Sequence, residues 1–336
     1  MAKKTYAEAI NEAHRLLLKT NKDVFVMGQG VDSPWCIGTS TIGLLSEFGP
    51  ERVRDTPISE NCVTGAAIGA AMAGMRPIVF HPRMDFMYYA MDQIINHCAH
   101  WNYMFGGKVN VPVTIRGIIN RGNEQAAQHS QTPLTMYAHV PGLKVVCPAS
   151  PYDAKGLLIA SVMDDNPVIY ADDRWLYELS EDIPEEIYEV PLGKARICRS
   201  GSDISVVAIS YFAQEAIAAA DALLQEGISV EVIDPRTLSP LDENTILESV
   251  KKTGHIVVAD PEWPNCGMAD HIASLIVRKG FDYLQKPPIL ITLPNTPAPA
   301  STSLEKVYYP RQKDIQAAVK KLMGFEEPRL FVRALK

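Results

Sequence analysis

A carboxylate at a predicted strand-to-helix junction is the first residue in this chain that could carry out acid–base chemistry. Glu60 follows Pro57 and Ser59, which favour a turn, and precedes small residues that include Gly65 and Gly69. We predict that a helix starts at or just after Glu60 and that its glycines let another backbone approach closely. On local sequence alone, the commoner role of such a carboxylate is to charge the first helical turn. Carboxylates under tightly packed helices are also often buried, which makes Glu60 a candidate for chemistry.

One histidine lies in a polar loop rather than on an apolar face. His129 stands between Gln128 and Ser130, in the loop 122–131 that follows a predicted strand. In open parallel sheets, the loops after the strands are where ligands bind. A single histidine is more often structural than catalytic, but this position favours a functional role. Helical or core-like stretches hold the histidines that we interpret as structural, which are His14, His97, His100 and His139.

The composition is that of an ordinary globular protein and excludes several classes. With 47% hydrophobic and 21% charged residues, the 336-residue chain can bury a substantial core. A net charge of -7 without a basic run argues against a nucleic-acid binder. We expect neither a membrane span nor a signal peptide, because no long apolar run is present. The six cysteines are scattered without a Cys-x-x-Cys pair, which favours reduced thiols and a cytoplasmic protein.

Apolar runs and amphipathic stretches alternate along the chain. The first series places strands at residues 23–28, 77–80, 111–116, 145–148 and 167–170, and helices at 5–20, 60–74, 81–96 and 153–163. Such alternation is typical of a parallel sheet covered by helices on both faces. A proline- and acid-rich stretch then interrupts the rhythm before a second series begins. We therefore predict two three-layer α/β/α domains at residues 1–178 and 201–336, joined by a linker at 179–200.

Common phosphate-binding and hydrolase motifs are missing from the sequence. It contains no Gly-x-Gly-x-x-Gly fingerprint, no Gly-x-x-x-x-Gly-Lys-Ser/Thr loop and no Gly-x-Ser-x-Gly elbow. An α/β enzyme of this kind either binds no phosphate or uses a phosphate loop that another chain supplies.

Several motifs, taken together and in order, resemble the β subunits of thiamine-diphosphate-dependent 2-oxo acid dehydrogenases. The resemblance covers nearly the whole chain, and the family includes pyruvate, branched-chain and acetoin enzymes. It depends on residues 55–71, Asp85-Phe86, Asp92-Gln93-Ile94, residues 128–131, 141–146 and 152–158, Glu231-Val232-Ile233-Asp234 and Arg236-Thr237.

The resemblance implies a pyrimidine-binding domain followed by a transketolase C-terminal domain, in an α2β2 heterotetramer. In this family a Gly-Asp-Gly…Asn motif of the α subunit holds the diphosphate and its Mg2+, and the present chain has no Gly-Asp-Gly. The cofactor would then lie at a subunit interface, and this chain alone would be inactive. The implied reaction is decarboxylation of a small 2-oxo acid and transfer of its acyl group to an acceptor, usually the lipoyl group of an acyltransferase core.

The resemblance also assigns roles to individual residues. Glu60 would be the acid that hydrogen-bonds the aminopyrimidine ring, with burial raising its pKa. Phe86 would stack on the pyrimidine, with Tyr89 beside it. His129 would relay protons or steer the acceptor.

Some members of the family also bind a structural potassium ion. Backbone carbonyls and Asp or Asn oxygens hold that ion in the family. The matching positions in this sequence are Val113, Ser161, Val162, Asp164 and Asn166.

The sequence departs from the better-known dehydrogenases near the substrate. Phe80 stands where the family usually has Glu, His81-Pro82-Arg83 follows, and the loop 120–124 is more polar than the usual glycine-rich version. These changes leave the substrate and the acceptor open.

Two other functions stay open at this point. One is a transketolase-type acyl or ketol transferase without a lipoyl partner, for which Arg83 and Arg121 are the only hints, as contacts for an anion. The other is a non-catalytic partner of an α chain. The presence of Glu60, Phe86 and His129 argues against this last function.

Overall fold

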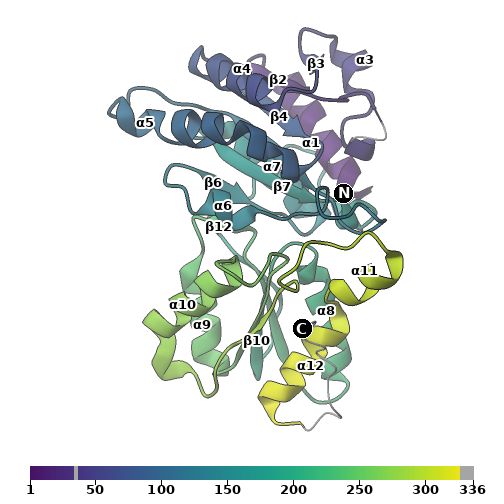
Figure 1. Cartoon of the computed structure of the whole chain (residues 1–336), viewed down its shortest axis with the longest axis vertical. Coiled ribbons are helices and arrows are strands. Elements are labelled where there is room, and N and C mark those ends of the chain that lie inside the picture. The colour runs from purple at the N-terminus through teal and green to yellow at the C-terminus, as the bar shows by residue number, and fades with distance from the viewer. Residues whose placement is uncertain (34–36, 326–336) are drawn as a thin grey trace. The chain divides into compact units, whose positions relative to one another are not determined.

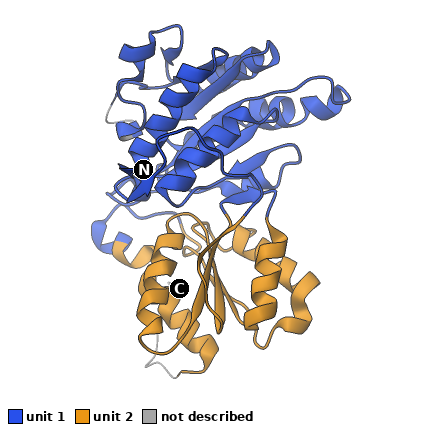
Figure 2. Ribbon diagram, turned by 180° about the vertical axis from the view of Figure 1, so that it is seen from behind, with its two compact units in different colours: residues 1–194, 236–241, 297–305 blue, residues 195–235, 242–296, 306–336 orange. Residues whose placement is uncertain are grey.

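The computed structural model describes residues 1–33 and 37–325, and the chain divides into two compact units (Figure 2). The first unit contains residues 1–194 together with two segments that return from later in the sequence, 236–241 and 297–305. The second contains residues 195–235, 242–296 and the described residues from 306 onward. Cys36 and residues 326–336 of the expected second domain lie outside the described residues.

The first unit is built on a seven-stranded sheet in the order β12-β6-β7-β5-β4-β2-β3 (Figure 1). Neighbouring strands are parallel except for β12, which pairs antiparallel with β6 at one edge. The strands are β2 (Val24–Gly28), β3 (Val53–Asp55), β4 (Arg76–His81), β5 (Thr114–Ile119), β6 (Lys144–Val146), β7 (Val168–Asp173) and β12 (Thr237–Ser239). Every residue of β2, β5 and β7 is buried, as expected for strands covered on both faces.

Local sequence explains where two of the longer helices of this unit begin. Thr5 and Glu8 form a reciprocal capping box at the start of α1, and Ser150 caps α7 with Pro151 in its first turn. Helices of this unit are α1 (Tyr6–Thr20), α3 (Leu44–Phe48), α4 (Glu60–Met72), α5 (Trp101–Met104), α6 (Leu134–Ala138), α7 (Pro151–Met163) and the first turn of α11 (Thr302–Tyr308). None of the described helices has the length and apolar composition needed to cross a membrane.

Two predictions for this unit need correction. The single helix expected at 81–96 is instead a 3-10 helix, η2 (Met84–Ala90), followed by a π-helical segment, η3 (Gln93–Ala99). Such departures from α-helical geometry often occur at functional sites. The strand expected at 111–116 lies three residues later, in β5, because Pro112 has no N–H to donate to a ladder.

The second unit has a five-stranded sheet in the order β14-β13-β10-β11-β9, antiparallel only at the β9 edge. Its strands are β9 (Arg196–Arg199), β10 (Ile204–Ala208), β11 (Val230–Asp234), β13 (Ile256–Ala259) and β14 (Ile289–Ile291). Its helices are α8 (Phe212–Leu224), α9 (Glu243–Thr253), α10 (Met268–Gly280) and α12 (Gln312–Met323). The predicted fold class of two α/β units with parallel sheets is confirmed.

The stretch expected to be a linker contains regular structure. Strand β8 (Ser180–Ile183) pairs antiparallel with the N-terminal strand β1 (Ala2–Thr5). The start of the expected linker is therefore part of the first unit. Strand β9 already belongs to the sheet of the second unit.

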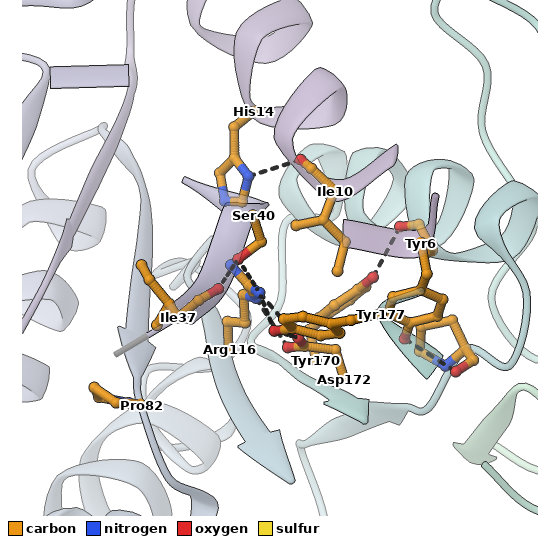
Figure 3. A network of polar contacts seen from close by, with 12 residues as sticks. Tyr6, Ile10, His14, Ile37, Ser40, Pro82, Arg116, Tyr170, Asp172 and Tyr177 are labelled. Atoms are coloured by element: carbon orange, nitrogen blue, oxygen red, sulfur yellow. Dashed lines mark hydrogen bonds and ion pairs between the residues drawn. The ribbon is translucent and has the colours of Figure 1, made fainter. Parts of the chain in front are cut away.

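A buried ion pair lies at the centre of the first sheet (Figure 3). The Nε and Nη2 atoms of Arg116 donate to the two carboxylate oxygens of Asp172, each at 2.9 Å. Arg116 Nη2 also donates to Ser40 Oγ at 2.8 Å, and the Tyr177 hydroxyl donates to Asp172 Oδ2 at 2.6 Å. Burial alone would lower the pKa of Arg116, but the charge of Asp172 raises it above its ordinary value. The guanidinium therefore stays charged, and its partner is essential.

We predict that Asp172→Asn destabilises the chain by about 3 kcal/mol or more, because it leaves the Arg116 charge buried and uncompensated. Urea unfolding followed by circular dichroism measures the change. The control is Glu51→Gln, which removes an exposed pair with Arg54 at 3.1 Å and should change stability by less than about 0.5 kcal/mol. Equal stabilities of the Asp172→Asn variant and the parent chain would contradict this account.

Candidate active site

Three loops at one edge of the first sheet carry the residues expected to do chemistry. Strand β3 leads to Glu60, β4 leads to Phe86 and β5 leads to His129. Because neighbouring parallel strands end at the same edge of a sheet, their following loops gather there. Strands β4 and β5 are direct neighbours, so the Phe86 and His129 loops are adjacent by topology.

Glu60 is the first residue of α4, as predicted. Its carboxylate lies in the first turn, where the helix dipole favours a negative charge. The expected burial is not reached in this single chain, in which Glu60 is only half-buried. The reason is that no described element of the chain fully covers the start of α4.

Side chains hold α4 against the end of β4 and the π-helical segment. Thr64 Oγ1 lies 3.1 Å from His81 Nε2, and burial lowers the pKa of His81 to about 4, so that this imidazole is neutral. A Cβ on Gly65 would lie 3.2 Å from Gln93 Oε1, whereas Gly69 faces open space. The expected close approach of another backbone is therefore wrong within the described chain, because a side chain packs at Gly65.

The structure brings Phe86 and His129 together. Their ring centroids lie 5.4 Å apart with the planes at 87°, an edge-to-face arrangement that aromatic pairs favour. Both side chains are half-buried, so each keeps a face available to a ligand. Tyr89 is 71% exposed.

Asp85 is a buried carboxyl beside this pair that the sequence did not reveal. It is 4% exposed, and its Oδ1 accepts a hydrogen bond from the Gln131 N–H at 3.0 Å. Burial raises the pKa of Asp85 to about 6, against the opposing effects of that N–H and of Arg83. In a regular helix Asp85 would have been taken as an exposed first-turn residue, so the local sequence gave no signal of its burial.

The loop that carries His129 has an unusual backbone. Asn123, Glu124 and Ala126 all have φ between 54° and 60°, in the left-handed region that residues other than glycine rarely adopt. The returning segment tethers the tip of this loop. Thr302 donates from its Oγ1 to Glu124 Oε1 at 2.6 Å, and the Glu124 N–H donates to Glu305 Oε1 at 2.9 Å.

The residues that depart from the family pattern have structural contacts. The ring of Phe80 is 1% exposed and packs over Gly28, where a Cβ would lie 2.6 Å from it. Arg121 forms an ion pair with Asp173 at 3.1 Å and lies over the Trp175 ring at 5.4 Å. Both positions are therefore part of the interior of the unit.

Arg83 connects the two loops of the site. Its Nη2 donates to Gln125 Oε1 at 2.8 Å, so it joins the segment that carries Phe86 to the loop that carries His129. Arg83 is half-buried and, unlike Arg121, stands immediately before the 3-10 helix η2.

The positions expected to hold potassium receive cations from the chain itself. Arg76 Nη1 donates to the carbonyl oxygens of Val162 and Asp164, each at 3.0 Å, and Lys144 binds the Asp164 carboxylate. Ser161 Oγ donates within its own helix to Leu157 O at 2.6 Å. A potassium ion would have to share these oxygens with Arg76. No group of three or more His, Cys, Asp and Glu side chains in the described part of the chain could hold a metal ion.

Comparisons with known proteins show the family of this chain. Residues 2–178 match the family "Transketolase, pyrimidine binding domain" and residues 193–315 match "Transketolase, C-terminal domain". The chain is 42% identical to the acetoin:2,6-dichlorophenolindophenol oxidoreductase subunit beta of Bacillus subtilis, over 96% of this chain and 98% of that protein. It is also 42% identical to the pyruvate dehydrogenase E1 component subunit beta of Rickettsia felis, over 95% and 98% of the two chains.

A solved structure shares the fold at lower identity. It is described as a split gene transketolase, inactive beta4 tetramer, and superposes with a TM-score of 0.77 at 21% identity. The superposition covers 96% of this chain and 99% of that one.

We predict that Asp85→Asn stabilises the chain near pH 8 and has little effect near pH 4. The raised pKa means that the folded state holds the Asp85 proton more tightly than the unfolded state, so its stabilising contribution is complete below about pH 4 and is lost as the pH rises through about 6. Asn carries no such dependence. The expected gain near pH 8 is at most about 3 kcal/mol, measured by urea unfolding at both pH values. A variant whose stability runs parallel to the parent between these pH values would rule out a buried titrating Asp85.

Proposed function

This chain belongs to the family of dehydrogenase E1 β subunits built from the transketolase pyrimidine-binding and C-terminal domains, and on that premise we propose that it supplies half of a thiamine-diphosphate site for a 2-oxo acid dehydrogenase. The observation that carries the proposal is the pairing of Phe86 with His129 at the strand edge where α4 begins with Glu60. The substrate would be a small 2-oxo acid, and the acceptor the lipoyl group of an acyltransferase core.

Each residue of this chain has a defined task in the proposed reaction. Thiamine diphosphate, when bound, supplies the carbon nucleophile that attacks the oxo carbon and allows carbon dioxide to leave. Glu60 holds a proton at the aminopyrimidine nitrogen. Phe86 stacks on that ring and excludes water, with the exposed Tyr89 available to cover its rim. His129 moves a proton to or from the substrate at the thiazolium side of the cofactor.

The surface around Glu60 supports a partner chain at this site. Helix α4 is apolar on all sides, yet it exposes Cys62, Ala66 and Gly69 in the single chain. Ile58 and Tyr89, at 74% and 71% exposure, add apolar surface. Helices that are apolar all round are buried in the functional assembly, and patches of this kind mark protein interfaces. An α subunit covering this face would complete the burial of Glu60.

We propose that the α partner also holds the diphosphate and Mg2+, in an α2β2 heterotetramer. The relatives are β subunits by name, which supports an α partner. We also propose a structural potassium ion at the Val162 and Asp164 carbonyls. The ion would share these two oxygens with Arg76, which donates to both. The free thiols at Cys62, Cys98 and Cys266 support a reducing compartment such as the cytoplasm.

The two other functions have less support. One of the two hints of a lipoyl-independent transferase is gone, because Arg121 is paired with Asp173 inside the unit. A purely structural partner has no need to keep an imidazole against an aromatic ring beside the start of α4.

We expect this chain, purified with its α partner, to release carbon dioxide from at least one 2-oxo acid in a panel. The assay contains thiamine diphosphate, Mg2+ and an artificial electron acceptor. Neither chain alone should turn over, because each holds half of the site. The variant that tests the role of Glu60 is Glu60→Gln, which keeps the side-chain shape but cannot provide the acid proton. It should lower the rate at least about 100-fold while the complex still assembles. Full activity of this variant, or no release from any acid despite bound cofactor, would refute the proposal.

Phe86→Ala should weaken thiamine diphosphate binding by about tenfold, because the stacked ring and its desolvation are lost. Isothermal titration calorimetry on the assembled complex measures the dissociation constant. The control is Phe281→Ala, an exposed phenylalanine of the second unit at 66% exposure, which should leave the constant unchanged. If the Phe86→Ala complex binds the cofactor as tightly as the parent, Phe86 does not stack on it.

A further inference from the structure

Asp85 joins the two segments that form the aromatic pair of the site. Its backbone directly precedes Phe86, and its Oδ1 accepts the Gln131 N–H, two residues after His129, at 3.0 Å. Phe86 and His129 face each other at 5.4 Å. One hydrogen bond therefore closes a ring of contacts through Asp85, Phe86, His129 and Gln131.

This bond is the described tether nearest to His129 on the C-terminal side of the loop. Contacts of the loop tip run through Glu124 to Thr302 and through Gln125 to Arg83, and all of these lie before His129. On the other side, Ser130 Oγ is buried and has no hydrogen-bond partner among the described residues. The Tyr88 hydroxyl reaches Gln131 Oε1 only at 3.3 Å.

The loop that carries His129 has a strained backbone, which the Asp85 hydrogen bond helps to hold in place. Asn123, Glu124 and Ala126 hold left-handed conformations that relax unless surrounding bonds fix them. Beyond His129, Arg121 Nη2 donates to Thr132 Oγ1 at 3.1 Å, so the His129 end of the loop is also held to Arg121. The Asp85 bond fixes that end relative to the segment that presents Phe86.

We propose that Asp85 is a positioning residue for His129: its carboxyl oxygen binds the Gln131 N–H and thereby fixes the imidazole against the Phe86 ring. The inference rests on the proposed function only for its effect on turnover. The contact itself concerns residues of this chain alone.

The acceptor oxygen, rather than the negative charge, is the feature that this role requires. The groups that interact electrostatically with Asp85 include Arg83, two residues before it, and Tyr137 of α6. Asp85 Oδ2 and the Tyr137 hydroxyl are both buried without a hydrogen-bond partner among the described residues. An amide at position 85 keeps the oxygen that accepts from Gln131 and removes the charge, so it separates the two effects.

The experiment compares Asp85→Ala, Asp85→Leu and Asp85→Asn in the assembled complex. Alanine and leucine both remove the acceptor, and leucine also fills the space, so one of them tests the bond if the other fails to fold. We expect kcat to fall about 10- to 100-fold in both, with the substrate KM and complex assembly unchanged, because misplacing a proton-transfer group affects the chemical step. Asp85→Asn should restore kcat to within about threefold of the parent. Asp182→Ala, at an exposed carboxylate of β8, is the control and should behave as the parent.

A second readout follows His129 directly. Diethyl pyrocarbonate acylates neutral imidazoles, and peptide mass spectrometry of the complex gives the rate at His129 as a function of pH. We expect Asp85→Ala to change the acylation rate at His129 and Asp85→Asn to leave that rate as in the parent. Exposed His139 serves as the internal reference.

These readouts distinguish the two proposals. If His129→Ala abolishes turnover but Asp85→Ala changes neither kcat nor acylation, the positioning role is wrong and the proposed function stands. If His129→Ala keeps full turnover while Asp85→Ala still alters acylation of His129, the tether stands and the role of His129 is wrong. Equal losses of kcat in Asp85→Ala and Asp85→Asn would overturn the inference, because the charge and not the hydrogen bond would then matter.

Discussion

The parallel pairing of β4 with β5 is the constraint on which the site depends. The ladder sets Val79 opposite Ile115 and His81 opposite Gly117, so β4 ends beside Gly117, β5 continues to Ile119, and their loops leave at the same edge of the sheet. Gly117 leaves room for the Met87 side chain of the 3-10 helix, which would have to shift if a Cβ were present there. The segment that carries Phe86 can therefore lie directly on the end of β5, from which the His129 loop emerges.

Buried charge reinforces this sheet from within. Arg116 of β5 and Asp172 of β7 lie on neighbouring strands, and the Tyr177 hydroxyl and Ser40 complete the set of partners (Figure 3). His14 lies close to the same guanidinium, and burial with the Arg116 charge lowers its pKa to about 3, so its ring stays neutral. A neutral imidazole beside a buried cation avoids a second uncompensated charge.

The site itself is held by bonds between segments far apart in the sequence. Segment 297–305 follows the strands of the second sheet in the sequence but belongs to the first unit, where Thr302 and Glu305 bind the His129 loop. Asp85 reaches across to Gln131 from the neighbouring strand end. These contacts hold backbone conformations that the loop residues do not favour by themselves, which is how proteins commonly keep functional groups in place.

The sequence by itself determined most of the regular structure, because helices and strands follow local patterns of apolar spacing, caps and turns. The start of α4 at Glu60 and the end of α7 at Met163 were predictable in this way, and the motifs around Glu60, Phe86 and His129 carried the family resemblance. Only the tertiary structure decided the rest. The 3-10 and π turns, the burial of Asp85 and the return of segments 236–241 and 297–305 depend on contacts between distant residues, which no local pattern records. The half-buried state of Glu60 also comes from the structure, because an apolar stretch does not tell whether its own chain or a partner covers it.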